Sequence, residues 1–229
     1  MILALLGILL LLAIYAPSVW VHFVMDKYSK DDPSIRGTGS ELATHLINRF
    51  QLEGVTVEET GPYQDHFDPS SNTVRLSPHN FNGRSLTAIA VAAHEVGHAI
   101  QFNRKEAISQ LRGQYIPKAV LINKLGIGIV MLMPLVGLIT RVPHAAVITV
   151  VAGVLAMLVS ALMYLIVLPE EWDASFNKAL PILTQGDYIN KNQEKAVRKI
   201  LKAAALTYFS GALANIVSLW RWLALLRFR

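Results

Sequence analysis

Long stretches without charged residues constrain this chain more than any other feature of its sequence. Residues Ala145 to Leu168 contain no charged side chain, and Ile2 to Val24 are almost wholly apolar. A helix of about 20 such residues, rising 1.5 Å per residue, crosses the hydrocarbon core of a bilayer. The composition agrees, because only 16% of the residues are charged and 53% are hydrophobic. These features predict a mainly α-helical, polytopic membrane protein with three to four transmembrane helices.

Four apolar segments separate the polar parts of the chain. The first is expected to be a retained anchor rather than a cleaved signal peptide, because no Lys or Arg precedes it. A second span is expected from Leu121 to Thr140, kinked at Pro134, and Ala145 to Leu168 then returns. The weaker segment Ala203 to Trp220 either crosses or lies in the interface with a basic face. The predicted divisions are an anchor (1–25), a catalytic region (26–117), a transmembrane hairpin (118–168), a second polar region (169–202) and a C-terminal helix (203–229).

The two polar regions, 26–117 and 169–202, are expected on the same side of the membrane, because an even number of crossings separates them. Basic residues follow the first span, which predicts that this side is cytoplasmic. The net charge of +5 is therefore interpreted as a preference for the cytoplasmic leaflet rather than for nucleic acid. The basic segment Lys191 to Lys202 is expected to be solvated or lipid-facing. The chain has no cysteine, which excludes disulfide scaffolds, Cys-ligated zinc and thiol catalysis.

The first polar region mixes helical and strand-like patterns, which predicts a small α+β catalytic region. Turn residues separate its segments, and an Ala-rich apolar helix ends it. The expected elements are a helix over 39–50 capped by Ser40, strands over 55–58 and 73–76, and a helix that begins at Ser85.

The last of these helices contains the sequence His94-Glu-Val-Gly-His98. Two histidines four residues apart lie on one helical face, so both imidazoles can reach one metal ion. Glu95 lies beside them and can accept a proton from water whose pKa zinc lowers to about 7. The neighbouring residues are apolar on nearly every face, so the cluster is expected to be buried, where unpartnered polar groups are unfavourable. The motif therefore predicts a catalytic zinc ion rather than surface histidines.

A catalytic zinc site needs a third protein ligand and an open position for water. Metzincins use a later glycine and a third His, but Gln101 and Arg104 occupy these places, which excludes that class. Among the remaining His, Asp and Glu residues, the best candidates lie in 168–175, where the third span leaves the bilayer. Glu170 is expected to be solvated there, whereas Glu171 is expected to face the zinc helix.

Two motifs together resemble a known arrangement. His94-Glu-Val-Gly-His98 followed far downstream by Glu171-Trp-Asp-Ala-Ser175 resembles the gluzincin pattern of the HtpX and CAAX-prenyl endopeptidases. The whole chain more closely resembles the YugP-like neutral zinc metallopeptidases of bacteria. The stretches that carry the likeness are 65–69, 74–77, 90–101 and 168–175. The resemblance implies a zincin-like fold in a bacterial cell membrane, with zinc held by His94, His98 and Glu171 and with Glu95 as general base.

One position departs from the gluzincin pattern. Ser175 stands where the related endopeptidases have an acidic residue that orients a histidine ligand, and a serine would not raise the basicity of that imidazole. Asp173 and Asp68 are candidates for this orienting role. His66 and His79 are candidates for stabilising an oxyanion, although both are more readily explained as ordinary loop histidines.

The leading hypothesis is a membrane-embedded zinc metalloendopeptidase that acts on proteins or peptides, including membrane proteins. An alternative is an intramembrane protease of the site-two type, with 86–102 inside the bilayer; that segment is short and flanked by Arg84 and Arg104. A third hypothesis is a zinc-binding membrane scaffold without proteolysis, but a structural zinc usually has four protein ligands. No oligomeric state follows from the sequence.

Overall fold

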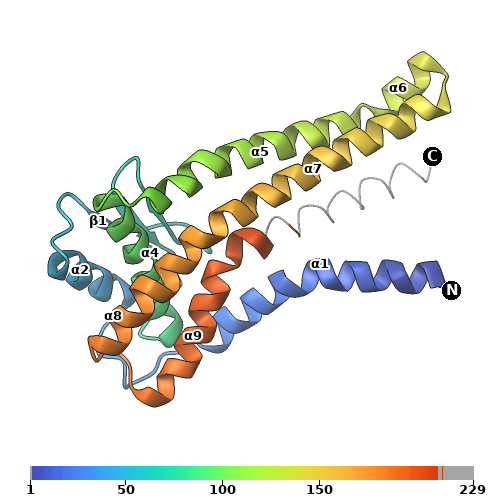
Figure 1. The fold of residues 1–229 in the computed structure, drawn as a ribbon. Coiled ribbons are helices and arrows are strands. Elements are labelled where there is room, and N and C mark those ends of the chain that lie inside the picture. Colours follow the sequence, from blue (N-terminus) through green and yellow to red (C-terminus); the bar gives the residue numbers. More distant parts are fainter. Residues whose placement is uncertain (1, 211–212, 214–229) are drawn as a thin grey trace. The chain divides into compact units, whose positions relative to one another are not determined.

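The computed structural model describes residues 2–210 and residue 213 (Figure 1). The chain divides into two compact units. The hairpin unit includes Leu111–Leu168, and the site unit consists of Val19–Gln110 and Pro169–Thr207.

The chain begins with two helices, α1 (Ile2–Lys27) and α2 (Gly39–Arg49). The N-cap of α2 is Thr38 and not Ser40, which corrects the predicted start of this helix. Thr38 accepts a hydrogen bond from the backbone N–H of Glu41, and the Glu41 carboxylate accepts one from the backbone N–H of Thr38. This reciprocal capping box satisfies two N–H groups that the helix itself cannot pair.

A small three-stranded sheet follows α2 in the site unit. Its strands are β1 (Thr56–Glu59), β2 (His66–Asp68) and β3 (Thr73–Leu76), in the order β1-β3-β2. β1 pairs with β3 in parallel and β2 pairs with β3 antiparallel, so β2 lies at an edge of the sheet. The strands expected over 55–58 and 73–76 are confirmed to within one residue. The short strand β2 was not predicted, because three residues between two turns show too little alternation to be recognised.

The zinc-motif helix is the centre of the site unit. After the short helix α3 (Pro78–Asn82), α4 (Leu86–Asn103) starts at its predicted N-cap, Ser85, whose hydroxyl accepts from the backbone N–H of Ala88. Every residue of α4 from Leu86 to Gln101 is buried. The apolar residues around the whole circumference of this helix therefore match a helix enclosed by protein.

The second polar region closes around α4. The long helix α7 (Pro143–Trp172) continues into a π-helical segment, η2 (Asp173–Ala179), and both η2 and α9 (Lys191–Ala205) pack on α4. The predicted basic segment 191–202 lies within α9. The C-terminal segment expected over 203–220 falls mostly outside the described residues. The site unit also contains the short elements η1 (Ala107–Ser109) and α8 (Leu180–Gln185).

The hairpin unit contains a bent helix and its return. The helices α5 (Gln110–Met131) and α6 (Met133–Thr140) meet beside Pro134 at an angle of 40°, which confirms the expected kink. Among the residues searched, the continuous helix Val147–Gln185 is long and apolar enough to cross a membrane, and the bent pair is a second such segment if it forms one span. The three to four spans expected from the sequence therefore stay a prediction.

Small residues bring α5 and α7 into close contact within the hairpin unit. A Cβ placed on Gly153 would lie 2.7 Å from the carbonyl oxygen of Gly126. Ser160 donates a hydrogen bond of 2.7 Å to the carbonyl oxygen of Ala119. Small residues and interhelical hydrogen bonds are the usual means of joining helices in lipid, where burial of apolar surface provides little driving force.

Replacing Gly153 with leucine is therefore expected to force α5 and α7 apart. Overpacking of a close contact lowers the free energy of unfolding by about 1–3 kcal/mol, so the protein purified in detergent should melt at a lower temperature. Gly128→Leu is the matched control, because a Cβ at Gly128 meets no atom within 4 Å. Equal melting temperatures for the two variants would contradict this account of the hairpin.

Candidate metal centre

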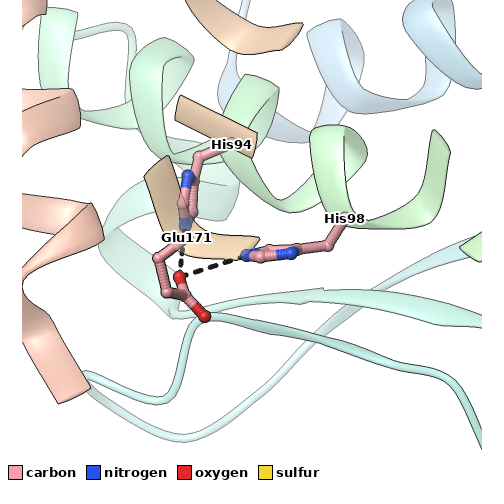
Figure 2. A group of neighbouring side chains, drawn as sticks. All are labelled: His94, His98 and Glu171. Carbon is pink, nitrogen blue, oxygen red and sulfur yellow. Dashed lines mark hydrogen bonds and ion pairs between the residues drawn. The ribbon is translucent and has the colours of Figure 1, made fainter. Parts of the chain in front are cut away.

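Three buried side chains converge in the site unit (Figure 2). His94 and His98 come from α4, and Glu171 comes from the last turn of α7. The Oε2 atom of Glu171 lies 3.3 Å from Nε2 of His94 and 3.2 Å from Nε2 of His98. One ligand atom from each residue lies within 4.8 Å of the others, so the three could hold a metal ion. The structure thus brings together two segments that are 73 residues apart in the sequence.

The orientation of the His94 ring follows from a serine on η2. The Ser175 hydroxyl donates to the carbonyl oxygen of Leu201 at 3.0 Å and lies 3.0 Å from Nδ1 of His94. A hydroxyl has one proton to donate, so it accepts a hydrogen bond from Nδ1–H of His94. The lone pair of this imidazole is therefore on Nε2, which faces Glu171.

The donor set of this cluster suits a cation. The lone pair on Nε2 of His94 and the carboxylate oxygen of Glu171 are both acceptors, so positive charge between them is needed to offset their repulsion. The second carboxylate oxygen of Glu171, Oε1, is buried and has no hydrogen-bond donor among the described residues. Two imidazole nitrogens and a carboxylate are ligands that zinc uses in catalytic sites. The residues present therefore fit zinc.

Glu95, which follows His94 in the sequence, is held by the edge strand. Its side chain is buried, and Oε2 accepts a hydrogen bond of 2.8 Å from the backbone N–H of Phe67 on β2. The short strand that the sequence analysis missed therefore positions a residue that the motif had singled out. Strand β2 contributes a backbone donor, which no side-chain pattern could have indicated.

The glycine inside the motif has a packing role. A Cβ on Gly97 would lie 2.8 Å from the carbonyl oxygen of Ala174 on η2. No other residue type allows α4 and η2 to approach so closely without displacement. The close packing of α4 on η2 at Gly97 also places Ser175 beside His94.

The expected exposure of Glu170 is wrong. Its side chain is buried, with 3% of the residue exposed, and its Oε1 lies 3.9 Å from Nδ1 of His98. The helix α7 runs on into η2, which packs against α4, so the carboxylates of Glu170 and Glu171 are both enclosed by protein.

The two aspartates proposed as histidine partners have other contacts. The Asp68 carboxylate accepts hydrogen bonds from Ser70, Ser71 and Arg75, and those from Ser70 and Arg75 contribute most to holding its pKa below the usual value. Asp173 accepts a hydrogen bond from Gln101, and not from an imidazole.

Ser175 and Gln101, rather than these aspartates, contact the Nδ1 atoms of His94 and His98. Gln101 lies three positions after His98, so both lie on one face of α4. The role of Gln101 could have been predicted from that spacing. Gln101 and Ser175 also lie inside the stretches that carry the family likeness, which is a second signal for both.

His66 and His79, the candidates for stabilising an oxyanion, are not part of the metal-binding group found among the described residues. Nδ1 of His66 lies 2.7 Å from the carbonyl oxygen of Gln64, and Nε2 of His79 lies 3.1 Å from that of Ser29. Both rings therefore donate to nearby backbone carbonyls. His66 is the first residue of β2 and His79 lies in α3, so the expectation that they are loop residues is wrong, although both rings have ordinary backbone partners.

Comparison with known proteins identifies the family of this chain. The model of a family described as "Putative neutral zinc metallopeptidase" matches residues 2–227. The chain belongs to this family. A relative from Bacillus subtilis (strain 168), named "Putative membrane protease YugP", is 34% identical over 219 residues, which cover 93% of each chain. No solved structure matches the chain.

Membership of this zinc metallopeptidase family indicates that zinc is the metal that the cluster could hold. The family matches over nearly the whole chain, including both segments that contribute to the centre. His94, His98 and Glu171 are buried and lie close together, and the chain that contains them belongs to a zinc peptidase family. The prediction from the sequence that the cofactor is zinc is thus confirmed.

Proposed function

We propose that this protein is a membrane-embedded zinc metalloendopeptidase whose zinc is held by His94, His98 and Glu171. The observation that carries the proposal is the convergence of these three ligand atoms within 4.8 Å, with an acidic side chain, Glu95, next to the first histidine. Three protein ligands leave a position for water, as in catalytic zinc sites. The family description and the name of the Bacillus relative support the same activity.

The catalytic chemistry is divided between the metal and Glu95. Zinc held by His94, His98 and Glu171 would polarise the scissile carbonyl and lower the pKa of water to about 7. Glu95 accepts a proton from the attacking water, whose oxygen forms a bond to the carbonyl carbon. The carbon–nitrogen bond then breaks, and Glu95 delivers the proton to the leaving amine. The backbone N–H of Phe67 holds the Glu95 carboxylate in place.

The substrate and location are proposed from the membrane segments. The long apolar helix Val147–Gln185 carries Glu171, so the third ligand is part of the same helix as a candidate span. A protein or peptide close to the bilayer is therefore the expected substrate, in a bacterial cell membrane. The basic residues after the first apolar segment favour a catalytic region on the cytoplasmic side.

Two other hypotheses receive less support. A protease of the site-two type would place α4 in lipid, but α4 is covered by α2, η2 and α9, and residues Leu86 to Gln101 are buried in protein. A zinc-binding scaffold would be expected to close its metal with four protein ligands. In the described part of the chain, the metal-binding group contains three residues.

Removal and return of zinc test the proposal. Purified protein in proteoliposomes is expected to contain one zinc ion per chain and to cleave labelled casein, a largely unfolded protein. Treatment with 1,10-phenanthroline should abolish cleavage, and added zinc should restore it. Undiminished cleavage by protein shown by mass spectrometry to be free of metal would overturn the assignment.

A further inference from the structure

The side chain of Gln101 is a buried polar group that the proposed reaction does not use. Gln101 lies three residues after His98 on α4 and has no exposed surface. Its Oε1 atom lies 3.0 Å from Nδ1 of His98, on the side of the ring opposite Glu171. A buried amide needs partners for two donors and for its carbonyl oxygen, so the identity of those partners determines how it is oriented.

The orientation of the Gln101 amide is fixed by two groups that can only accept. Its Nε2 atom donates to the backbone carbonyl of Glu170 at 3.1 Å and to Oδ2 of Asp173 at 2.8 Å. A backbone carbonyl and a carboxylate have no proton to offer. A reversed amide would place its oxygen against both, so the NH₂ group must lie on that side and Oε1 must face His98.

The protonation of His98 follows from this orientation. Because Oε1 of Gln101 can only accept, Nδ1 of His98 must carry a proton and donate it. The lone pair of the imidazole is then on Nε2, which lies 3.2 Å from Oε2 of Glu171. Neutral histidine binds a metal through such a lone pair, and the hydrogen bond on the other nitrogen sets which nitrogen is free.

Asp173 is itself held in place from outside the centre. Lys178 forms an ion pair with Asp173 at 3.1 Å and another with Glu106 at 3.1 Å. Asn177 donates to the other oxygen of Asp173 at 2.7 Å. The amide of Gln101 is thus connected to η2 and to the segment after α4 by a continuous set of polar contacts.

We propose that Gln101 is the positioning residue for His98: its amide, anchored by Glu170 and Asp173, fixes the tautomer and ring orientation in which His98 binds zinc. This inference rests on the proposed metal centre. Gln101 acts through His98 and does not touch the substrate. Its counterpart on the other ligand is Ser175, which orients His94 through a hydroxyl.

The first test replaces Gln101 with methionine, which has a similar shape but no amide. Loss of a hydrogen-bonding partner of a metal-binding histidine weakens metal affinity about 10–100-fold. Competition with a chromophoric chelator should show this weakening for Gln101→Met, and the cobalt-substituted protein should show a shifted visible spectrum. The matched control is Thr87→Val, which removes a buried side-chain hydrogen bond, to the carbonyl oxygen of Met25, from the same helix. It should leave zinc affinity unchanged.

A second pair of variants tests the direction of the hydrogen bonds. Gln101→Glu keeps an acceptor for His98 but places a carboxylate against Asp173, so zinc affinity should fall. Adding Asp173→Asn supplies a donor where the carboxylate stood, so the double variant should bind zinc more tightly than Gln101→Glu alone. This comparison decides the proposal if Gln101→Met does not fold.

The outcomes separate this proposal from the metal assignment. If wild-type protein does not bind zinc, the proposed centre fails first. If wild-type protein binds one zinc ion and Gln101→Met binds it equally well with an unchanged cobalt spectrum, Gln101 has no positioning role. Equal affinities for Gln101→Glu and the double variant would also overturn that role.

Discussion

Glu95→Gln is expected to slow peptide cleavage by about 10²–10⁴-fold while leaving zinc bound. The substitution keeps the size of the side chain and an oxygen that can accept from the backbone N–H of Phe67. It removes the group that accepts the proton of the attacking water, and positioned acid–base groups contribute about 10²–10⁴-fold to such reactions. Turnover of a labelled casein by the zinc-loaded variant should therefore fall by a factor in this range, while the zinc content stays at that of the wild type.

Glu58→Gln is a suitable control for this experiment. Glu58 is an exposed carboxylate on β1 that pairs with Arg75. Its replacement should leave both turnover and zinc content unchanged. Cleavage at the wild-type rate by zinc-loaded Glu95→Gln would show that another group accepts the proton.

Glu171→Gln is expected to have opposite effects on metal binding and on the stability of the metal-free protein. The substitution removes the anionic ligand, so zinc affinity should fall by more than the roughly 10–100-fold that loss of an outer contact causes. Without metal, the buried Glu171 carboxylate faces the Nε2 atoms of His94 and His98, and its Oε1 has no donor among the described residues. A glutamine amide can donate to those nitrogens, so the metal-free variant should melt no lower than metal-free wild type.

The neighbouring carboxylate provides the comparison for Glu171. Glu170 is equally enclosed, but its carboxylate lies 3.9 Å from Nδ1 of His98, the nitrogen that faces away from Glu171. Glu170→Gln should therefore reduce zinc affinity less than Glu171→Gln. The assignment of the third ligand would be refuted by the reverse order, measured by chelator competition on the two purified variants.

The Glu171 experiment addresses a general property of functional sites. Hydrogen-bond acceptors that face one another at a metal site repel and so destabilise the metal-free chain, and a bound metal ion offsets this repulsion. Zinc should therefore raise the melting temperature of the wild type but not that of Glu171→Gln. The stability of the site unit is thus linked to zinc binding at the proposed metal centre.

Much of the site could be predicted from the sequence because its signals are local. The spacing of His94 and His98 fixes their common face on any α-helix, and the start of α4 at Ser85 follows from its capping preference. The likeness around Glu171 predicted that this residue joins the two histidines, and the structure places it beside them. Local spacing, however, could not show that Glu170 is buried, because the exposure of a side chain depends on which elements pack on it.

The sequence by itself determined the helix, the two imidazoles on one face of it, the acid beside them and the long apolar segments. Only the tertiary structure decided which groups orient those imidazoles. Because η2 packs against α4, Ser175 reaches His94 and Asp173 reaches the amide of Gln101 that faces His98. Strand β2 supplies the backbone donor to Glu95. The physical reason is that a helical period is encoded by neighbouring residues, whereas a hydrogen bond between distant segments exists only once the chain has folded.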